Sequence, residues 1–241
     1  AKGLEVETAL RMSQVIEEEL PSSYRGHICA LSGPNLVREI AAGKPATSVV
    51  ASRCEEAARW VQSLLMSPTF RLYTHQDLVG VELCGALKNI IAIAAGAADG
   101  FEVGDNAKAA LVTRGLAEIT RLGVAMGANP LTFAGLAGVG DLVATCSSRH
   151  SRNHYVGMEL ARGRKPAEIQ AGMRMVAEGI YTTKAARKLA ERYGVEMPIT
   201  EEIYQILFEG KDPRNVVMEF MLRHPKAELE GLEQQKRSWP Q

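Results

Sequence analysis

The most informative segment of the chain reads Val81-Glu-Leu-Cys-Gly-Ala-Leu-Lys88-Asn89-Ile-Ile-Ala-Ile-Ala-Ala-Gly96. Glycine and alanine crowd this segment, so we expect a central helix against which neighbouring backbone packs closely. Lys88 and Asn89 are its only strongly polar residues between Leu83 and Ala98. A lysine in such surroundings loses water, which lowers its pKa and suits it to acid/base chemistry near neutral pH. The alternative is a lysine whose stem covers apolar surface while its ammonium reaches solvent.

Helical patterns continue from this segment almost to the C-terminus. Asp77 is expected to cap the first of these helices. Apolar spacing, with breaks at glycine and proline, predicts helices at about residues 78–98, 106–126, 153–162, 179–193, 198–209 and 213–222. The last stretch, residues 226–241, is polar and is expected to fray.

In the first 76 residues, helices alternate with short apolar strands. The pattern predicts helices at residues 4–20, 36–42 and 55–66, and strands at residues 27–31, 47–51 and 70–73. Three short strands form a poor independent sheet, so this part looks like the end of a larger α/β unit. The predicted fold class is therefore mainly α, with an α/β part at residues 1–76, an all-helical domain at 77–225 and a polar tail at 226–241.

Composition limits the classes of function. With 241 residues, 46% of them apolar, the chain can bury a substantial core. The 28 basic and 28 acidic residues give zero net charge, which argues against a nucleic acid partner or whole-surface binding to anionic lipid. No unbroken apolar run reaches the roughly 18 residues of a membrane span, and there is no secretory signal. Four separated cysteines without a CxxC pair favour a reducing, cytoplasmic setting.

Common nucleotide-binding and hydrolase motifs are missing, among them GxGxxG, GxxxxGK[ST], HExxH and GxSxG. The nearest glycine cluster, Gly135-Leu-Ala-Gly138-Val-Gly140, has a different spacing and leads directly into Asp141. Its glycines suggest a tight loop that presents the Asp141 carboxylate to a cation or a hydroxyl group. The alternative role for Asp141 is an N-cap for the following turn.

A third polar segment reads Cys146-Ser-Ser-Arg-His-Ser-Arg-Asn-His154. Between residues 149 and 165, five Lys or Arg residues accompany one acidic residue. Hydroxyl, amide and guanidinium groups together suit a phosphate. Cys146, His150 and His154 follow an i, i+4, i+8 spacing that would suit a metal on a helix. Because the composition is loop-like and no carboxylate completes a ligand set, we expect no metal, and a solvated loop remains the other alternative.

Six short motifs occur in order along nearly the whole chain, to about residue 222. They are Ala1-Lys2-Gly3-Leu4-Glu5, Leu31-Ser-Gly-Pro34, Gly85-Ala-Leu-Lys-Asn89, Thr113-Arg-Gly-Leu-Ala-Glu118, Gly138-Val-Gly-Asp-Leu142 and Ser151-Arg-Asn153. Together they resemble the NAD(P)-dependent glycerol-3-phosphate dehydrogenases, most closely the bacterial form. The resemblance implies that residues 1–76 are the C-terminal remnant of a Rossmann-like domain, entered after its glycine-rich loop. The helical part is then a substrate domain of the 6-phosphogluconate dehydrogenase C-terminal-like type.

The resemblance also implies a role for individual residues. Lys88 becomes the catalytic acid/base that exchanges a proton with the carbonyl oxygen of dihydroxyacetone phosphate. The implied substrate-binding residues are Lys2, Gly33, Asn35, Asn89, Asp141, Thr145, Ser151, Arg152 and Asn153, the last three around the phosphate. The implied cofactor-binding residues are Val37, Arg152, Val176 and Glu178.

The implied reaction interconverts sn-glycerol 3-phosphate and dihydroxyacetone phosphate with NAD or NADP. It would feed glycerophospholipid synthesis, in a cytoplasmic homodimer. The choice between the two cofactors depends on a region near the second strand of the nucleotide domain, which the resemblance places outside this chain. Two alternatives stay open: a helical dimerisation or interaction module without catalysis, and a related two-domain dehydrogenase for another phosphorylated substrate.

Overall fold

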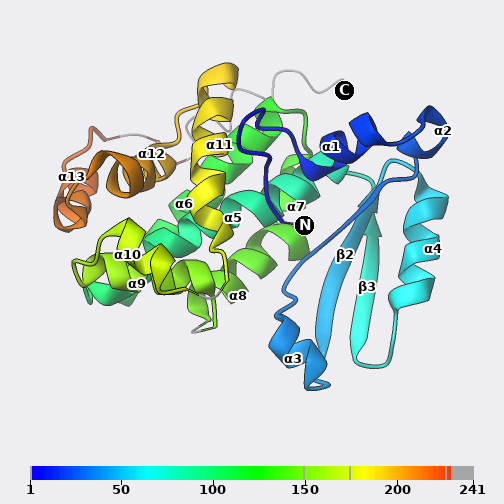
Figure 1. Ribbon diagram of the computed structural model, residues 1–241, viewed down its shortest axis with the longest axis horizontal. Coiled ribbons are helices and arrows are strands. Elements are labelled where there is room, and N and C mark those ends of the chain that lie inside the picture. The colour runs from blue at the N-terminus through cyan, green and yellow to red at the C-terminus, as the bar shows by residue number, and fades with distance from the viewer. Residues whose placement is uncertain (1, 149, 174, 226, 229–241) are drawn as a thin grey trace.

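The computed structural model describes residues 2–148, 150–173, 175–225 and 227–228. A small sheet with its own helices lies beside a larger body of helices, as Figure 1 shows. Of the polar tail predicted at residues 226–241, only 227–228 are among the described residues. The architecture is therefore mainly helical with a three-stranded sheet, as the sequence predicts.

The sheet contains the three strands expected from the sequence. They are β1 (Cys29–Ser32), β2 (Ala46–Ser52) and β3 (Phe70–His75), in the order β1-β2-β3. β1 and β2 run antiparallel, with Ala30 opposite Ala51, whereas β2 and β3 run parallel. α3 (Val37–Ala41) joins β1 to β2, and α4 (Glu55–Leu65) connects β2 to β3. Ala58 of α4 is buried with Val50 and Leu72 of the sheet, so this part has a small core of its own.

The helix predicted at residues 4–20 is wrong in its first half. α1 covers only Met12–Glu19 and is followed by α2 (Ser22–Arg25). Before it, Leu4 pairs with Arg11 in an antiparallel bridge, and Ala9 has a φ of 60°. A residue in this left-handed region interrupts a helix, so the apolar spacing from Leu4 to Leu10 belongs to a tight loop.

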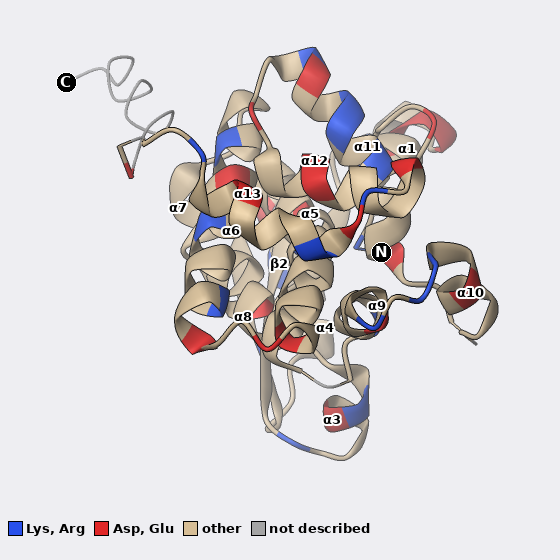
Figure 2. Cartoon of the chain, turned by 90° about the vertical axis from the view of Figure 1, so that its left-hand side faces the viewer, with Lys and Arg blue, Asp and Glu red and all other residues tan. Residues whose placement is uncertain are grey.

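The long apolar helix, α5 (Leu78–Gly100), is the centre of the molecule, as predicted. Its Asp77 cap is confirmed, because the carboxylate accepts a hydrogen bond of 2.8 Å from the Gly80 amide. α5 packs most extensively against α6 (Asp105–Ala125), α8 (Asp141–Ser147), α9 (Arg152–Ala161) and α11 (Glu178–Tyr193). Figure 2 shows that basic and acidic residues are both spread over the surrounding helices, consistent with the zero net charge.

Several short elements were not predicted separately from the sequence. They are α7 (Pro130–Phe133), the π-helical turn η1 (Leu136–Gly140), α8 and α10 (Pro166–Ala171). The predicted helix at 198–209 consists of α12 (Pro198–Tyr204) and a second π-helical turn, η2 (Gln205–Glu209). The one at 213–222 consists of a 3-10 turn, η3 (Pro213–Asn215), and α13 (Val216–Met221). Short helices lack the repeated apolar spacing that makes longer ones visible in a sequence.

Glycines allow α5 and α9 to approach closely. A Cβ atom on Gly157 of α9 would lie against the Ile93 carbonyl oxygen and the Ala97 amide of α5. A Cβ atom on Gly96 of α5 would meet the His154 carbonyl of α9. Backbone therefore contacts backbone at this crossing, which is the packing expected from the small residues of α5.

Two segments satisfy the length and composition criteria of a membrane span, Leu78–Gly100 and Pro130–Ser147. In the first, 89% of the apolar window is buried inside the protein. The second is interrupted by the change from α7 to η1 and α8. Neither segment is an unbroken apolar run, so neither was predicted as a membrane span from the sequence. A core helix of a soluble protein meets the same criteria, and the burial of α5 is typical of one.

The crossing of α5 and α9 is tested by Gly157→Ala. Alanine should lower the free energy of unfolding by about 2 kcal/mol or more, because its Cβ has no space against the α5 backbone. Urea denaturation measures the change. Gly26→Ala is the control, since Gly26 has a φ of −70° and nothing within 4 Å of the added atom. Equal stability of the two variants would contradict this helix packing.

Candidate active site

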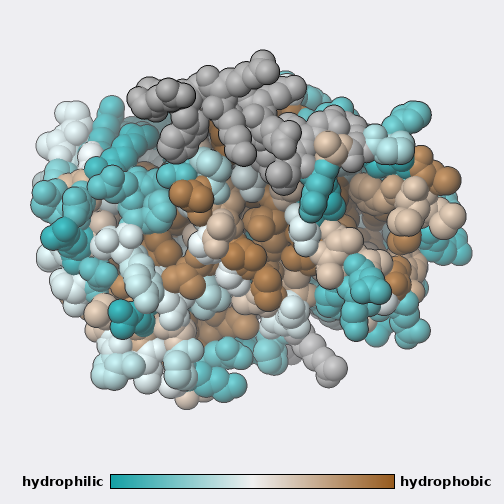
Figure 3. All heavy atoms as spheres, turned by 180° about the vertical axis from the view of Figure 1, so that it is seen from behind, coloured by the Kyte–Doolittle hydropathy of each residue, from teal (hydrophilic) through white to brown (hydrophobic). Residues whose placement is uncertain are grey.

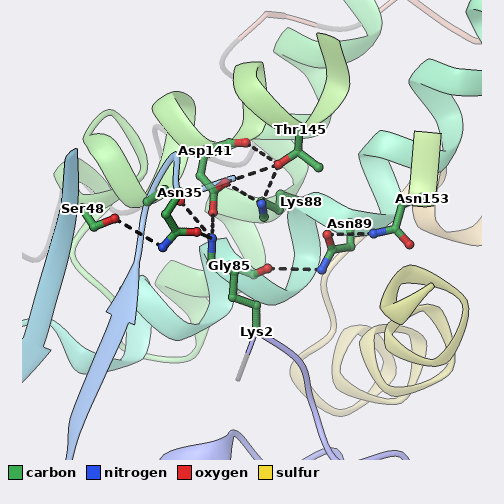
Figure 4. A network of polar contacts seen from close by, with 10 residues as sticks. Lys2, Asn35, Ser48, Gly85, Lys88, Asn89, Asp141, Thr145 and Asn153 are labelled. Atoms are coloured by element: carbon green, nitrogen blue, oxygen red, sulfur yellow. Dashed lines mark hydrogen bonds and ion pairs between the residues drawn. The ribbon is translucent and has the colours of Figure 1, made fainter. Parts of the chain in front are cut away.

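Lys88 lies in the middle of α5 with only 6% of its surface exposed. Its Nζ donates hydrogen bonds of 2.5 Å to Asp141 Oδ1 and of 2.5 Å to Thr145 Oγ1, both on α8 (Figure 4). Burial lowers the pKa of Lys88 to about 8, although the nearby Asp141 carboxylate acts in the opposite direction. The Lys88 ammonium is therefore enclosed by the protein and does not reach solvent, so the alternative of an ammonium in water is not observed.

Asp141 lies between two lysines. While Oδ1 accepts from Lys88, Oδ2 accepts from Lys2 Nζ at 2.6 Å. The predicted tight loop before Asp141 is wrong, since η1 runs directly into α8 and Gly140 has helical torsion angles. Gly138 is needed for packing, because a Cβ there would collide with the Phe133 carbonyl. The carboxylate binds the lysines and makes no cap to α8 in the structure, in contrast to the N-cap alternative.

The loop after β1 completes the surroundings of Lys2. Lys2 Nζ donates to the Gly33 carbonyl at 2.9 Å and to Asn35 Oδ1 at 2.8 Å. Gly33 has a φ of 133°, and a Cβ atom there would lie 2.9 Å from Ser48 Cα, so glycine is required at this position. Asn35 Nδ2 in turn donates to Ser48 Oγ at 3.3 Å, which links the loop to β2. Ser48 was not identified from the sequence.

A second polar group lies next to Lys88 on the same helix. Asn89 Oδ1 accepts a hydrogen bond of 2.9 Å from Asn153 Nδ2 (Figure 4). Asn153 Oδ1 accepts one of 2.9 Å from the Gly179 amide. Ser151 caps α9, since its Oγ accepts from the His154 amide at 3.2 Å. Asn89 directly follows Lys88 in the chain, so its contact with Asn153 fixes the start of α9 close to Lys88.

The residues predicted to bind the cofactor are brought together only in part. Arg152, which is exposed, donates from Nη1 to the Val176 carbonyl at 2.5 Å, so these two positions are adjacent. Glu178 begins α11, and its Oε2 lies 3.7 Å from the place of a Cβ on Gly3. Val37 lies on α3 beside the sheet, with 77% of its surface exposed.

The basic stretch between residues 149 and 165 does not form one cluster of free cations. Arg162 and Arg164 both pair with Glu159, at 2.5 Å and 2.6 Å. Arg149 lies outside the described residues. Arg152 lies at the start of α9, next to Ser151 and Asn153, and its guanidinium contacts the Val176 carbonyl. Among the described basic residues of this stretch, Arg152 is therefore the candidate for the phosphate site.

The metal alternative is not supported among the described residues, which contain no group of three or more His, Cys, Asp or Glu residues able to hold a metal ion. His154 Nε2 lies 2.7 Å from Asp99 Oδ2, which also accepts from Lys108. Burial raises the pKa of the Cys146 thiol to about 12, which disfavours the thiolate form that binds metals.

Glu118 is a buried acidic residue that the motifs contain but that sequence analysis left without a role. Its carboxylate accepts from the amides of Ile199 and Thr200, at 2.8 Å and 2.9 Å, and so caps the start of α12. Burial raises its pKa. The available signal was an acidic residue directly flanked by the apolar residues Ala117 and Ile119, and its role here is structural.

A cavity of about 930 Å³ lies between α5, α6, α12 and α13. Its lining includes Leu111, Ile203 and Phe220 but neither Lys88 nor Asp141. Apolar side chains also gather on the face seen in Figure 3, opposite to the view of Figure 1. The predicted site residues Lys88 and Asp141 therefore lie outside this cavity.

Two family models match the chain. The NAD-dependent glycerol-3-phosphate dehydrogenase C-terminus matches residues 77–218, and the N-terminus of the same enzymes matches residues 1–58. The chain is 55% identical over 228 residues to glycerol-3-phosphate dehydrogenase (NAD(P)+) of Geobacter metallireducens, and 55% identical over 230 residues to that of Desulfitobacterium hafniense. Each alignment covers 95% of this chain, and they cover 68% and 64% of the relatives. The chain thus spans about two thirds of the length of these relatives.

Solved structures give the same result. The crystal structure of glycerol-3-phosphate dehydrogenase from Coxiella burnetii matches with a TM-score of 0.86 and 39% identity, over 92% of this chain and 67% of that chain. The enzyme from Saccharomyces cerevisiae matches with a TM-score of 0.77 and 30% identity, over 89% and 65% of the two chains.

Asp141→Asn tests the electrostatics of the lysine pair. Because the Asp141 carboxylate raises the pKa of Lys88 against the effect of burial, its loss should bring that pKa below about 8. Nitrogen-15 NMR titration of the lysine side chains measures the value, with Lys88→Met identifying the signal. Asp212→Asn, which removes an exposed carboxylate paired with Arg214, is the control. An unchanged or higher pKa in Asp141→Asn would contradict the described geometry.

Proposed function

The chain belongs to the NAD-dependent glycerol-3-phosphate dehydrogenase family, and on this basis we propose that it interconverts sn-glycerol 3-phosphate and dihydroxyacetone phosphate with NAD or NADP. The observation that carries the proposal is Lys88, a buried ammonium directed by Asp141 and Thr145. With its pKa lowered to about 8, this group exists in both protonation states near neutral pH.

Lys88 exchanges the proton in this reaction. NAD(P)H, when bound, supplies the hydride that reduces the carbonyl carbon. The Lys88 ammonium stabilises the negative charge that develops on the carbonyl oxygen and then donates its proton to that oxygen. In the reverse direction the neutral amine accepts the proton of the hydroxyl group. Asp141 and Thr145 orient Nζ in both directions, since each accepts a hydrogen bond from it.

The substrate's charge fits the charges around Asp141. Two ammonium groups, of Lys2 and Lys88, face one carboxylate, which leaves a net positive charge near the reacting atoms. This charge favours a phosphate monoester over a neutral polyol. We place the three-carbon part of the substrate against residues from both sides of the cluster, namely Lys2, Gly33, Asn35, Asn89, Asp141 and Thr145.

The phosphate is assigned to the start of α9, at Ser151, Arg152 and Asn153. α9 is ten residues long, so its first turn offers amide groups and a favourable dipole for an anion. Arg152 adds an exposed guanidinium, which suits phosphate oxygens. Asn153 is held by Asn89, so this anion site is fixed relative to Lys88.

The residues predicted to contact NAD(P) are compatible with a dinucleotide in composition. Arg152 supplies a cation for a phosphate, and its contact with Val176 brings a second predicted position beside it. Glu178 supplies an acceptor at the start of α11, near Gly3. Val37 offers an exposed apolar side chain next to the loop that contains Asn35. These residues would hold the cofactor beside the lysine cluster, with Val37 on the sheet side and the other three at the starts of α9 and α11.

We further propose a domain boundary at residues 76 and 77, with a polar tail from residue 226. The two family models support this division, because one matches residues 1–58 and the other begins at residue 77. A homodimer in the cytoplasm that feeds glycerophospholipid synthesis is part of the same proposal. The relatives named as dehydrogenases, at 55% identity, favour this function over a non-catalytic interaction module and over another phosphorylated substrate.

Lys88→Met is the direct test of the proposed function. Loss of the acid/base should lower kcat/KM by about a thousandfold or more in the full-length enzyme. The absorbance of NAD(P)H follows turnover, and circular dichroism checks the fold. Lys44→Met is the control, because the Lys44 side chain is 64% exposed and pairs with Glu39 on the surface. Turnover close to the unmodified level in Lys88→Met would exclude Lys88 as the acid/base.

The pH dependence of the two directions should be opposite. Reduction of dihydroxyacetone phosphate needs protonated Lys88, so its rate should fall as the pH rises through about 8. Oxidation of sn-glycerol 3-phosphate needs the neutral amine, so its rate should rise through the same range. Profiles of kcat/KM in both directions measure this. Two profiles with the same slope around this pH would contradict the role given to Lys88.

A further inference from the structure

A short loop, residues 4–11, connects Lys2 to the rest of the molecule, and we call it the strap. Leu4 and Arg11 pair at its base in an antiparallel bridge. Inside it, the Glu5 amide donates to the Leu10 carbonyl at 2.9 Å, which closes the loop. Lys2 lies two residues before Leu4. Because Leu4 pairs with Arg11, the position of Arg11 also determines the position of the backbone at Lys2. In Figure 1 this dark blue segment rises from the N-terminus beside α11 and leads to α1.

The base of the strap is locked to α5 by a buried carboxylate. Glu82 accepts hydrogen bonds from Arg11 Nη1 at 2.5 Å and from Ser13 Oγ at 2.6 Å through the same oxygen. Its other oxygen accepts from the Ser13 amide at 2.7 Å. The side chains of Arg11 and Glu82 are each 6% exposed. Charge-assisted hydrogen bonds that are shielded from water hold geometry far better than pairs on the surface.

The same helix also supports the stem of Lys2 and carries Lys88. A Cβ atom on Gly85 would lie 3.2 Å from Lys2 Cγ, so the lysine stem crosses α5 at Gly85. Glu82, Gly85 and Lys88 are spaced at intervals of three residues, about one helical turn. One rigid element therefore sets the place of the lock, of the Lys2 stem and of the Lys88 ammonium.

The polar contacts between the strap and α11 are exposed, whereas Leu4 and Ala9 of the strap are buried in the main core. Lys188 Nζ donates to the carbonyls of Val6 and Glu7 at 3.1 Å and 3.0 Å, and Arg192 donates to that of Thr8 at 3.4 Å. All three come from α11 and are open to solvent, where such contacts contribute little. Among these polar contacts the network at Glu82 is therefore the buried one, and it fixes the Arg11 end of the strap in addition to the apolar packing of Leu4 and Ala9.

We propose that Glu82 is a positioning residue, which locks Arg11 and Ser13 so that the strap holds the Lys2 ammonium against Asp141. Its kinetic consequence rests on the proposed function of Lys88. The titratable groups that act on Lys88 are Asp141, Lys2 and Cys146, and the Lys2 charge lowers the pKa of Lys88. When Lys2 moves away from Asp141, Lys88 loses a repelling cation and no longer shares the carboxylate, so its pKa should rise.

Glu82→Gln in the full chain tests this inference. We expect the pKa of Lys88, from nitrogen-15 NMR titration, to rise by about one pH unit, as expected when one of two close ammonium groups departs. In the full-length enzyme, the KM for dihydroxyacetone phosphate should rise by about tenfold while kcat changes less, because the proposed function places Lys2 against the substrate. A loss of stability alone would not change the pKa of Lys88 in the folded molecules. It would also not raise KM more than it changes kcat.

Glu159→Gln is the matched control. Glu159 has the same 6% side-chain exposure, also pairs with arginines, and lies on α9 away from the strap. It should lower stability without changing the pKa of Lys88. If Glu82→Gln does not fold, Ser13→Ala decides, because it removes only the hydroxyl that donates to Glu82 and accepts from Arg11, and it should change the pKa of Lys88 in the same direction by less. An unchanged pKa of Lys88 in the folded variant, or an equal change in Glu159→Gln, would overturn the proposal.

The inference and the proposed function fail in different experiments. The titration of Lys88 in Glu82→Gln needs no turnover, so it tests the positioning of Lys2 by itself. Normal turnover in Lys88→Met would remove the proposed function while a raised pKa in Glu82→Gln would still support the role of Glu82.

Discussion

The carboxylate of Asp141 holds together three parts of the chain that are far apart in sequence. One oxygen binds Lys88 of the central helix, and the other binds Lys2 of the N-terminal segment. Lys2 in turn reaches Gly33 and Asn35 in the loop after the first strand. A buried ammonium without a partner would be strongly destabilising, so the position of each of these segments depends on this one shared acid.

The arrangement requires a rigid and dry support, which α5 provides. Almost all of its residues are buried, and glycines allow α9 to approach until backbone meets backbone. The same burial that stabilises the fold removes water from Lys88 and lowers its pKa to about 8. Packing and chemistry therefore have one cause: the apolar helix excludes solvent from its own lysine, and Asp141 limits how far its proton affinity falls.

Predictions based on local patterns succeeded where the pattern was long. The central helix, its Asp77 cap and the three strands were all visible, because apolar spacing and cap chemistry are properties of neighbouring residues. The helix predicted at residues 4–20 was wrong in its first half, because the positive φ of Ala9 and the bridge from Leu4 to Arg11 are stabilised by contacts elsewhere. Asp141 was expected in a loop for a similar reason: its glycines serve packing against Phe133 and not a turn.

The chemistry-bearing residues were already distinguishable in the linear chain. A lysine and an asparagine isolated among alanines and glycines, an aspartate after a glycine cluster, and six motifs in order pointed to this family and to most of the candidate site. Their pairing was not available from the chain, since Asp141 is 53 residues from Lys88 and 139 from Lys2. The buried lock of Arg11, Ser13 and Glu82 had no signal at all. Local sequence carries helix spacing and residue chemistry, whereas which charges share a buried carboxylate depends on how the segments pack in space.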